Sequence, residues 1–399
     1  MKRLFTSLAV GALFVGSQVM AGEFSKLEQL ITDLNKHDKA MMAVSVRENG
    51  KIIYEKYEGL ASLEAKTQVS KDSKYRIGSI SKVYTAVLTM MAVEEGKLKL
   101  SDTLAAFFAQ IPNSDKITIE HLLAHRSGLF NFTNDPNYTS YMEEGKTRTE
   151  MLDIIKNYES DFAPGEKHEY SNSNYILLSL ILEKVYNKEL ALLLQEKIAK
   201  PLNLNNTLLA TDAKLADKEV QSFRYQDGWQ AMPVTHMSIP MGAGAVVSTP
   251  RDVSQFMTDL FNGKLVSKST LENMTQMRDG YGLGLMTFPF HNTLAKGHGG
   301  AIDGFRSNAA YIEDDKLAIT VISNGLNFNM NEVLIALLSS YYDKPFDLPD
   351  FETKAIQLAG DKLESFVGEF ESQQLPMDIK MFIEQDTLMA QATGQGAIP

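Results

Sequence analysis

The sequence predicts an α+β fold in which an antiparallel sheet is flanked by helices and interrupted by a helical subdomain. Strand patterns with turn signals occur near the start of the chain and return in its last third. A helical and loop-rich block lies between them, roughly over residues 98–235. Strands from both ends of a chain can share one sheet while the middle packs as a separate lobe. We therefore expect a main domain over residues 22–344 with the helical subdomain inserted in it.

Local signals define the first elements of this domain. An apolar stripe predicts an amphipathic helix over residues 24–36. Strand patterns over residues 43–47 and 52–57 are joined by an Asn-Gly pair, which suits the positive φ angles of a type I′ turn. A helical run over residues 79–95 stops at Gly96, a residue type that commonly ends helices.

The last third of the domain carries equally clear signals. Thr249 and Pro250 fit the N-cap and the first position of a helix. Strand patterns over residues 305–312 and 317–323 predict a second hairpin, and a helical pattern covers residues 331–342.

A short β appendage is expected at the end of the chain. Prolines mark a linker over residues 345–361, and residues 362–399 follow it. That piece is too small for a core of its own, so we expect a partial β module that packs on the main domain. Its strand patterns cover residues 366–370, 377–383 and 387–392.

The first 21 residues are typical of a secretory signal peptide. Lys2 and Arg3 precede an apolar run over residues 4–15, and small or apolar residues stand before a cleavage point at Gly22. An uncleaved anchor is the alternative, but the run is shorter than the roughly 20 residues that a span needs. We expect a secreted, bacterial periplasmic protein with no membrane span after removal of the signal.

Composition excludes several classes of protein. The 399 residues are 44% hydrophobic and 22% charged, as in globular proteins. The absence of cysteine excludes disulfides, cysteine-ligated metals and a cysteine nucleophile. The 39 basic and 50 acidic residues give a net charge of −11, which argues against nucleic acid as a partner.

Ser79 and Lys82 form the strongest chemical signal, because they are the only Ser-x-x-Lys in the chain. Residues three apart on a helix share a face, so the lysine can reach the serine hydroxyl. A serine becomes a good nucleophile when a base takes its proton, and a lysine can be that base if burial lowers its pKa. The alternative is a helix cap followed by a surface lysine.

Two further motifs are each unique in the chain. Tyr170 and Asn172 form a Tyr-x-Asn in a polar loop before an apolar helix over residues 176–185, where a phenol and an amide can point into one cleft. His298 precedes Gly299 and Gly300, and adjacent glycines beside a strand indicate close approach to the backbone. The alternatives are a polar turn and a glycine-rich turn.

Together, the three ordered motifs resemble those of the serine β-lactamase and penicillin-recognising superfamily, as do segments 118–129, 242–252 and 281–284. The tyrosine in the second motif and the histidine in the third are similar to the class C-like branch, which includes DD-peptidases, D-aminopeptidases and esterases. The resemblance implies a β-lactamase/transpeptidase-like fold and covers residues 24–343. True class C enzymes normally have lysine at position 298, so the histidine argues against efficient β-lactam hydrolysis.

The resemblance also implies a role for each matched residue. Ser79 forms an acyl-enzyme, Lys82 and Tyr170 share the acid and base work, and Asn172 holds the substrate amide. The wall opposite is formed by His298, Gly299 and Gly300. The backbone N–H groups of Ser79 and Ala301 form the oxyanion hole.

The expected activity is that of a secreted serine hydrolase that cleaves an amide or ester bond without metal or cofactor. Its substrate is a small molecule or peptide, such as a D-alanyl peptide derived from peptidoglycan, a D-amino-acid amide or a short ester, with weak β-lactam hydrolysis. His121 and His125 are four apart but lack an acidic partner for a metal site. The alternatives are a penicillin-binding sensor without turnover and a scaffold protein. The oligomeric state does not follow from the sequence.

Overall fold

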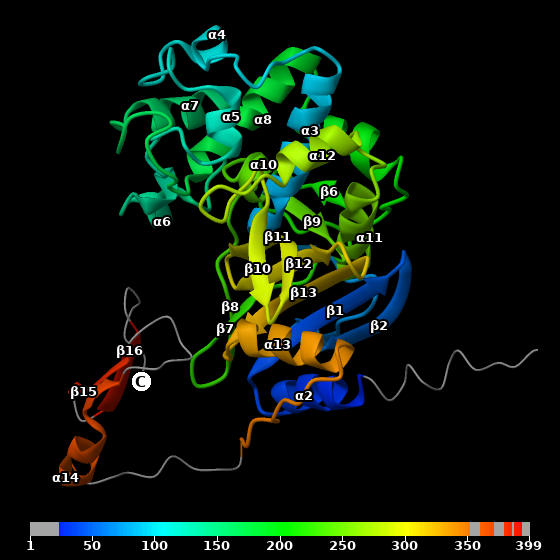
Figure 1. Ribbon diagram of the computed structural model, residues 1–399, viewed down its shortest axis with the longest axis vertical. Helices are drawn as coiled ribbons and strands as arrows, with labels where there is room; N and C mark the ends of the chain where they lie inside the picture. Colours follow the sequence, from blue (N-terminus) through cyan, green and yellow to red (C-terminus); the bar gives the residue numbers. More distant parts are fainter. Residues whose placement is uncertain (1–23, 352–359, 371–378, 385–386, 393–399) are drawn as a thin grey trace, which may run out of the picture. The chain divides into compact units, whose positions relative to one another are not determined.

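Figure 1 shows the computed structural model, in which residues 24–351, 360–370, 379–384 and 387–392 are described. The chain divides into two compact units, Met1–Leu348 and Pro349–Pro399. The expected signal peptide over residues 1–21 lies outside the described residues, so it stays a prediction. Within the part of the chain that is described, no helix is long and apolar enough to cross a membrane.

An antiparallel sheet forms the centre of the first unit, and its main strands follow the order β10-β11-β12-β13-β1-β2. The chain thus returns from its last third to pair β13 with β1, as the sequence predicts. The two short strands β7 and β8 extend the sheet beside the end of β13. The bounds are β1 Ala40–Glu48, β2 Lys51–Glu58, β7 Phe223–Tyr225, β8 Trp229–Ala231, β10 Met286–Phe290, β11 Thr293–Ile302, β12 Phe305–Ile312 and β13 Leu317–Leu326.

Both predicted hairpins are confirmed. Asn49 and Gly50 join β1 to β2 with φ angles of 49° and 79°, as a type I′ turn requires. β12 and β13 pair from Ile312↔Leu317 onward. Pairing with β2 and β12 buries β1 and β13, whereas β2 stays partly exposed at the edge.

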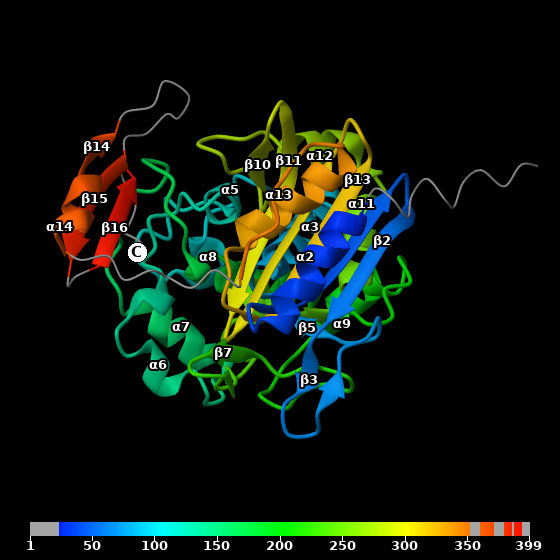
Figure 2. The ribbon, with the colours of Figure 1, turned by 90° about the horizontal axis from the view of Figure 1, so that it is seen from below.

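Helices cover both faces of the sheet. α2 (Ser25–Lys36) and α13 (Met330–Tyr341) lie side by side on one face, as Figures 1 and 2 show. α11 (Pro250–Phe261) packs on the other face against β1 and β13. The Thr249 side chain caps α11 by accepting from the backbone N–H of Asp252, which confirms the predicted start of the helix.

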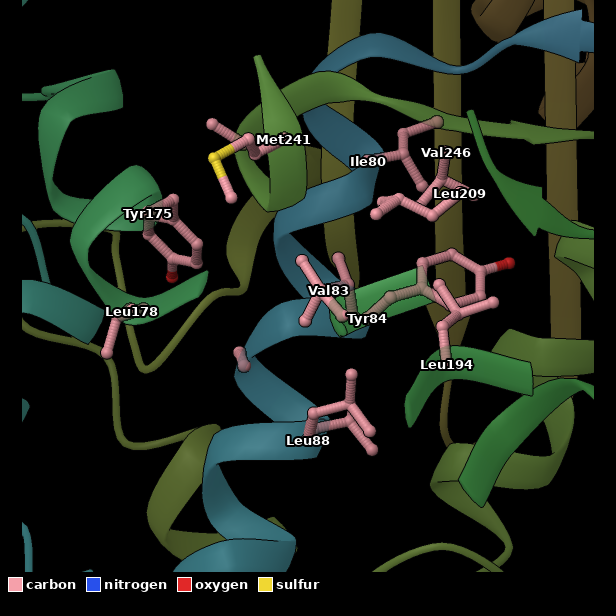
Figure 3. Close-up of a cluster of buried hydrophobic side chains, with 14 of the residues drawn as sticks. Ile80, Val83, Tyr84, Leu88, Tyr175, Leu178, Leu194, Leu209, Met241 and Val246 are labelled. Carbon is pink, nitrogen blue, oxygen red and sulfur yellow. The ribbon is translucent and has the colours of Figure 1, made fainter. Parts of the chain in front are cut away.

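Two helices buried on almost every side form the core next to the sheet. α3 (Ser81–Glu94) and α8 (Asn172–Tyr186) pack on each other and on the short α10 (Met241–Gly244). Figure 3 shows Val83 and Leu88 of α3 between Tyr175 of α8 on one side and Leu194 on the other. Such all-round burial fixes the position of any polar group that α3 carries into the core.

The predicted helical block contains mainly helices, and its last strands join the sheets. Its helical elements are α4 Ala105–Phe108, α5 Ile119–Leu123, η2 Phe132–Asn134, α6 Tyr138–Tyr141, α7 Arg148–Lys156, α8, α9 Leu190–Leu194 and η3 Gln195–Ala199. Its strands are β6 (Leu208–Leu209), β7 and β8. Elements outside this block and the main sheet are β3 Leu60–Ser62, β4 Thr67–Gln68, β5 Tyr75–Arg76, η1 Gly78–Ile80, β9 Val246–Ser248 and α12 Lys268–Met274.

The second unit contains a three-stranded antiparallel sheet in the order β14-β15-β16. α14 (Gly360–Leu363) and η4 (Glu364–Phe366) precede it. The strands are β14 Gly368–Phe370, β15 Ile379–Glu384 and β16 Thr387–Ala392, close to the three predicted segments. Residues 352–359 of the predicted linker lie outside the described residues.

Candidate active site

Ser79 stands at a tight junction between two elements. It lies in the 3₁₀ turn η1 directly before α3, rather than inside the helix as its sequence pattern suggests. Gly78 has a φ of +52°, and a β-carbon there would lie 2.8 Å from the backbone nitrogen of Ala301. Glycine at position 78 therefore lets the turn press against β11, which places Ser79 next to that strand.

Lys82 reaches Ser79 from the first turn of α3, as the three-residue spacing predicts. Its side chain is completely buried. The Nζ atom lies 2.9 Å from Ser79 Oγ, 2.8 Å from Asn172 Oδ1 and 2.7 Å from the carbonyl oxygen of Ala243. These three partners come from three separate elements, so the amine has a single defined position.

The surroundings of Lys82 favour its neutral form. Burial lowers the pKa of the Lys82 amine well below its ordinary value. A neutral amine has two hydrogens and one lone pair. Asn172 Oδ1 and the Ala243 carbonyl can only accept, so they take the two hydrogens and the lone pair faces the hydroxyl of Ser79. This arrangement suits a base.

Tyr170 is the second side chain that contacts Ser79 Oγ. Its hydroxyl lies 2.8 Å from Ser79 Oγ and donates to it, while Lys82 Nζ lies 4.8 Å from the centre of the ring. Burial raises the pKa of the Tyr170 phenol, so the hydroxyl keeps its proton near neutral pH. The serine oxygen can therefore give a proton on one side and receive one on the other.

Asn172 is the first residue of α8 rather than part of a loop, which corrects the expected local structure. Its Oδ1 atom accepts from Lys82. Its Nδ2 atom donates to Asn131 Oδ1 at 3.2 Å and to Thr133 Oγ1 at 3.1 Å. Both amide hydrogens of Asn172 thus have protein partners, and its Oδ1 atom holds the amine of Lys82 in place.

His298 is buried and uncharged. Its Nδ1 atom lies 2.5 Å from the carbonyl oxygen of Gly299, which can only accept, so Nδ1 carries the proton. Nε2 then accepts from the hydroxyl of Tyr281 at 3.1 Å. Burial lowers the pKa of His298 to about 3, and the ammonium form that Lys82 takes at low pH acts in the same direction. The histidine therefore adds no positive charge to the site near neutral pH.

One half of β11 offers an open edge. β10 pairs only with residues 293–297 of β11, and within the described residues no strand covers the same edge from His298 onward. η1 lies against this part instead. A β-carbon at Gly300 would lie 2.2 Å from the carbonyl oxygen of Ile77, so glycine is needed there too. Ala301 follows directly, beside the turn that carries Ser79.

Sequence reasoning missed two aromatic residues that support the site. His125, for which the sequence predicts a packing or hydrogen-bonding role and no part in the site, lies completely buried with its ring 4.3 Å from that of Tyr170. Its Nδ1 atom accepts from the backbone N–H of Ser171. Tyr281 lies 4.9 Å from His125 and also bonds His298. The segments around both residues carry the family resemblance, which was the available signal.

Two hollows open beside Ser79, and among the described residues that line each of them one is charged. We call them the Asp303 hollow, of about 340 Å³, and the Arg306 hollow, of about 440 Å³. Ser79 and Ala301 line both. Asn172 lines the first, and Tyr170, His298, Gly299 and Gly300 line the second. No group of three His, Asp or Glu side chains in the described part of the chain is placed to hold a metal.

An α+β fold in which a serine stands in the turn before a core helix, paired with a lysine in the first turn of that helix, is that of a serine hydrolase that acts on amide or ester bonds. The sequence then gives the family, because residues 27–339 match the pattern of the Beta-lactamase family. The chain belongs to that family.

Two relatives whose names state an activity share about a quarter of their residues with this chain. A teichoic acid D-alanine hydrolase of Staphylococcus aureus is 24% identical over 277 residues, which is 68% of this chain and 68% of that protein. The crystal structure of a D-amino acid amidase from Ochrobactrum anthropi SV3 in complex with D-phenylalanine superimposes with a TM-score of 0.72 at 22% identity, over 82% of this chain and 99% of that one.

A penicillin-binding protein homologue from Pyrococcus abyssi, described as octameric, has the same fold. It superimposes with a TM-score of 0.71 at 23% identity and covers 94% of this chain and 89% of its own. The two structural likenesses confirm the predicted fold class, and the family match over residues 27–339 confirms the superfamily.

Proposed function

We propose that the protein hydrolyses D-aminoacyl amides or esters through an acyl-enzyme on Ser79. The observation that carries this proposal is the buried Lys82 amine, whose Nζ lies 2.9 Å from Ser79 Oγ with its two other partners acting as acceptors. A lysine kept neutral in this way can take the serine proton at neutral pH.

The reaction proceeds in two halves. Ser79 Oγ attacks the substrate carbonyl carbon while its proton moves to Lys82. The bond to the leaving group then breaks, and that proton passes on to the leaving nitrogen or oxygen through Tyr170, so no net proton is gained or lost. In the second half, water attacks the acyl-enzyme, gives one proton back to Ser79 Oγ, and releases a carboxylic acid.

The oxyanion hole belongs to the same proposal. The backbone N–H groups of Ser79 and Ala301 stand on η1 and on the open edge of β11, which press against each other. Two such donors aimed at a developing oxyanion can each contribute about 3 kcal/mol to the lowering of the barrier. Asn172 acts by fixing Lys82, and it meets the substrate amide only if it releases Asn131 or Thr133.

The D-aminoacyl class is supported by the names of the relatives, one a teichoic acid D-alanine hydrolase and the other a D-amino acid amidase. D-Alanyl peptides and short esters are further candidate substrates for the same acyl-enzyme chemistry. Weak β-lactam hydrolysis is also expected. The neutral His298 supplies no positive charge at the position where a lysine would bind the carboxylate of a penicillin.

The place of action follows from the same reasoning. A substrate of this kind, derived from the cell wall, would lie outside the inner membrane. The signal peptide expected over residues 1–21 agrees with secretion to the periplasm. The chemistry requires no cofactor.

A fluorophosphonate probe and a panel of D-alanyl peptides, D-amino-acid amides, p-nitrophenyl esters and nitrocefin test this proposal. The wild type should be labelled and should turn over the aminoacyl substrates, whereas Ser79→Ala should do neither. A fluorescent penicillin that stays bound for hours without consumption of any substrate would favour the sensor. Absence of labelling by both probes would favour the scaffold.

A further inference from the structure

The Asp303 hollow is lined by an ion-paired aspartate that the acyl-enzyme chemistry does not use. Asp303 follows β11 in the turn to β12, two residues beyond Ala301. Along an extended strand two residues span roughly 7 Å. A carboxylate at this position is therefore within reach of a short acyl group held at Ser79.

Asp303 belongs to a buried group of three charges. Arg76 Nε donates to Glu219 Oε1 at 2.7 Å, and Arg76 Nη1 lies 3.3 Å from Asp303 Oδ2. The side chains of Arg76 and Glu219 are 0% exposed and that of Asp303 is 2% exposed. Two carboxylates thus share one guanidinium, and the group carries a net charge of about −1 when all three are ionised.

One oxygen of Asp303 is poorly satisfied. Oδ1 accepts from the backbone N–H of Thr235 at 3.2 Å and from its hydroxyl at 2.6 Å. Among the described residues, the contact of Oδ2 is the long one from Arg76 Nη1, and that nitrogen also donates to the Thr235 carbonyl at 2.8 Å. Burial raises the pKa of Asp303, which is the expected response of a carboxylate that lacks a full counter-charge.

We propose that the Asp303 hollow binds the ammonium group of the substrate's acyl part, with Asp303 Oδ2 as its acceptor. The preferred substrates are then amides and esters whose acyl group carries a free amine next to the carbonyl carbon. This inference rests on the proposed function, because the hollow receives an acyl group only if Ser79 becomes acylated.

The walls of the hollow suit a small cationic group. Phe132 and Tyr138 line it with their rings 5.9 Å apart, and aromatic faces attract ammonium ions. The Thr235 hydroxyl gives its proton to Asp303, and its oxygen is also a hydrogen-bond partner of the Tyr138 side chain. Burial raises the pKa of Tyr138 to about 12, and the negative charge of Asp303 adds to the rise, which agrees with a field that favours cations here.

The charge that lines the Arg306 hollow favours the same orientation of the substrate. It belongs to Arg306, which repels an ammonium group. A substrate with its amine at Asp303 therefore places the leaving group towards Arg306. The reversed placement brings like charges together, which costs free energy.

Asp303→Asn is the central variant, because it removes the charge at almost constant volume and leaves Arg76 paired with Glu219. Asp227→Asn is a matched control. Both aspartates stand in hairpin turns with similar φ angles, 49° for Asp303 and 51° for Asp227, and Asp227 is exposed in the β7–β8 turn. Asparagine tolerates this backbone conformation well.

The assay compares the phenyl esters of D-alanine and D-lactic acid, which differ in an ammonium against a hydroxyl. We expect the ratio of their kcat/KM values to fall at least tenfold in Asp303→Asn and to stay within about twofold of the wild type in Asp227→Asn. Because the two esters differ in intrinsic reactivity by the same factor with every enzyme, that difference cancels when the ratio in the variant is divided by the ratio in the wild type. An unchanged ratio in Asp303→Asn overturns the inference, whereas a wild type that hydrolyses neither ester contradicts the proposed function instead.

A second measurement needs neither turnover nor the variant. D-Alaninol and D-1,2-propanediol are compared for their ability to slow the labelling of wild-type Ser79 by a fluorophosphonate. We expect half-protection by the ammonium compound at a concentration at least tenfold lower. Equal protection by both compounds overturns the inference even if Asp303→Asn does not fold.

Discussion

The two hollows beside Ser79 carry opposite charges in different ways. Asp303 is fixed by Thr235 and Arg76 inside the protein, whereas Arg306 is exposed and its Nη1 atom donates to backbone carbonyls of its own turn. A buried charge acts through a low dielectric and is little affected by salt. An exposed charge is screened and contributes less. We therefore expect strict selection of the acyl group and loose selection of the leaving group.

Removal of Ser79 should abolish the activity that both hollows serve. In Ser79→Ala, kcat/KM should fall by at least ~1000-fold for every substrate, because no other nucleophile stands between the hollows in the described structure. The thermal unfolding midpoint should change little, since the hydroxyl is small. Residual turnover within tenfold of the wild type would show that another group performs the attack.

Replacement of Lys82 comes next in size. Lys82→Met keeps most of the buried volume but removes the base, so kcat should fall ~100- to 1000-fold. The phenyl esters of D-alanine and D-lactic acid should lose rate by the same factor. Two acceptors, Asn172 Oδ1 and the Ala243 carbonyl, lose their donor, which should lower the free energy of unfolding by about 1–3 kcal/mol. Steady-state kinetics and urea denaturation measure the two effects separately.

The pH profile separates the base from the neighbouring histidine. The Lys82 pKa is lowered, so protonation as the pH falls through that pKa should reduce kcat/KM about tenfold per pH unit. His298 has a pKa of about 3, so it is neutral at pH values well above 3. His298→Gln should therefore retain the acidic limb, and loss of the limb in that variant would assign it to the histidine.

Arg306→Ala should have a smaller effect, confined to the leaving group. We expect KM to rise about three- to tenfold for substrates whose leaving group bears a carboxylate or phosphate, and the effect should shrink at 0.5 M salt. The preference for D-alanyl over D-lactyl esters should remain. A loss of that preference would mean that the two hollows do not act independently.

Tyr281→Phe should have the smallest effect. It leaves His298 Nε2 without its donor but keeps the ring beside His125, so kcat/KM should fall about two- to fivefold. A fall as large as that of Lys82→Met would place Tyr281 in the proton path instead of behind the wall.

Much of the fold could be predicted because its signals are local. The Asn49-Gly50 turn, the cap at Thr249 and the apolar stripe of α2 depend on residues close in the chain. The same holds for Ser79 and Lys82, whose three-residue spacing predicts that their side chains meet, although Ser79 lies in η1 and Lys82 in the first turn of α3. Short-range geometry follows from the chemistry of the residues themselves.

The roles of Asn172 and His298 illustrate where that reasoning ends. The spacing of the Tyr-x-Asn motif indicates a shared cleft, and the structure does bring both residues to the site. The motif spacing does not reveal that Asn131 and Thr133 accept the two amide hydrogens of Asn172. Likewise, the sequence indicates that His298 can be neutral, but burial and the Tyr281 bond fix its proton on Nδ1.

By itself, the sequence determined the order of the motifs, the α+β class and the pairing of a serine with a lysine one helical turn away. Only the tertiary structure decided that the Lys82 amine is buried and that β10 leaves one edge of β11 unpaired beside it. It also decided that Arg76, Glu219 and Asp303 meet at the Asp303 hollow. These three charges are distant in the chain. Burial and charge balance depend on which distant segments pack together, and no local pattern encodes that packing.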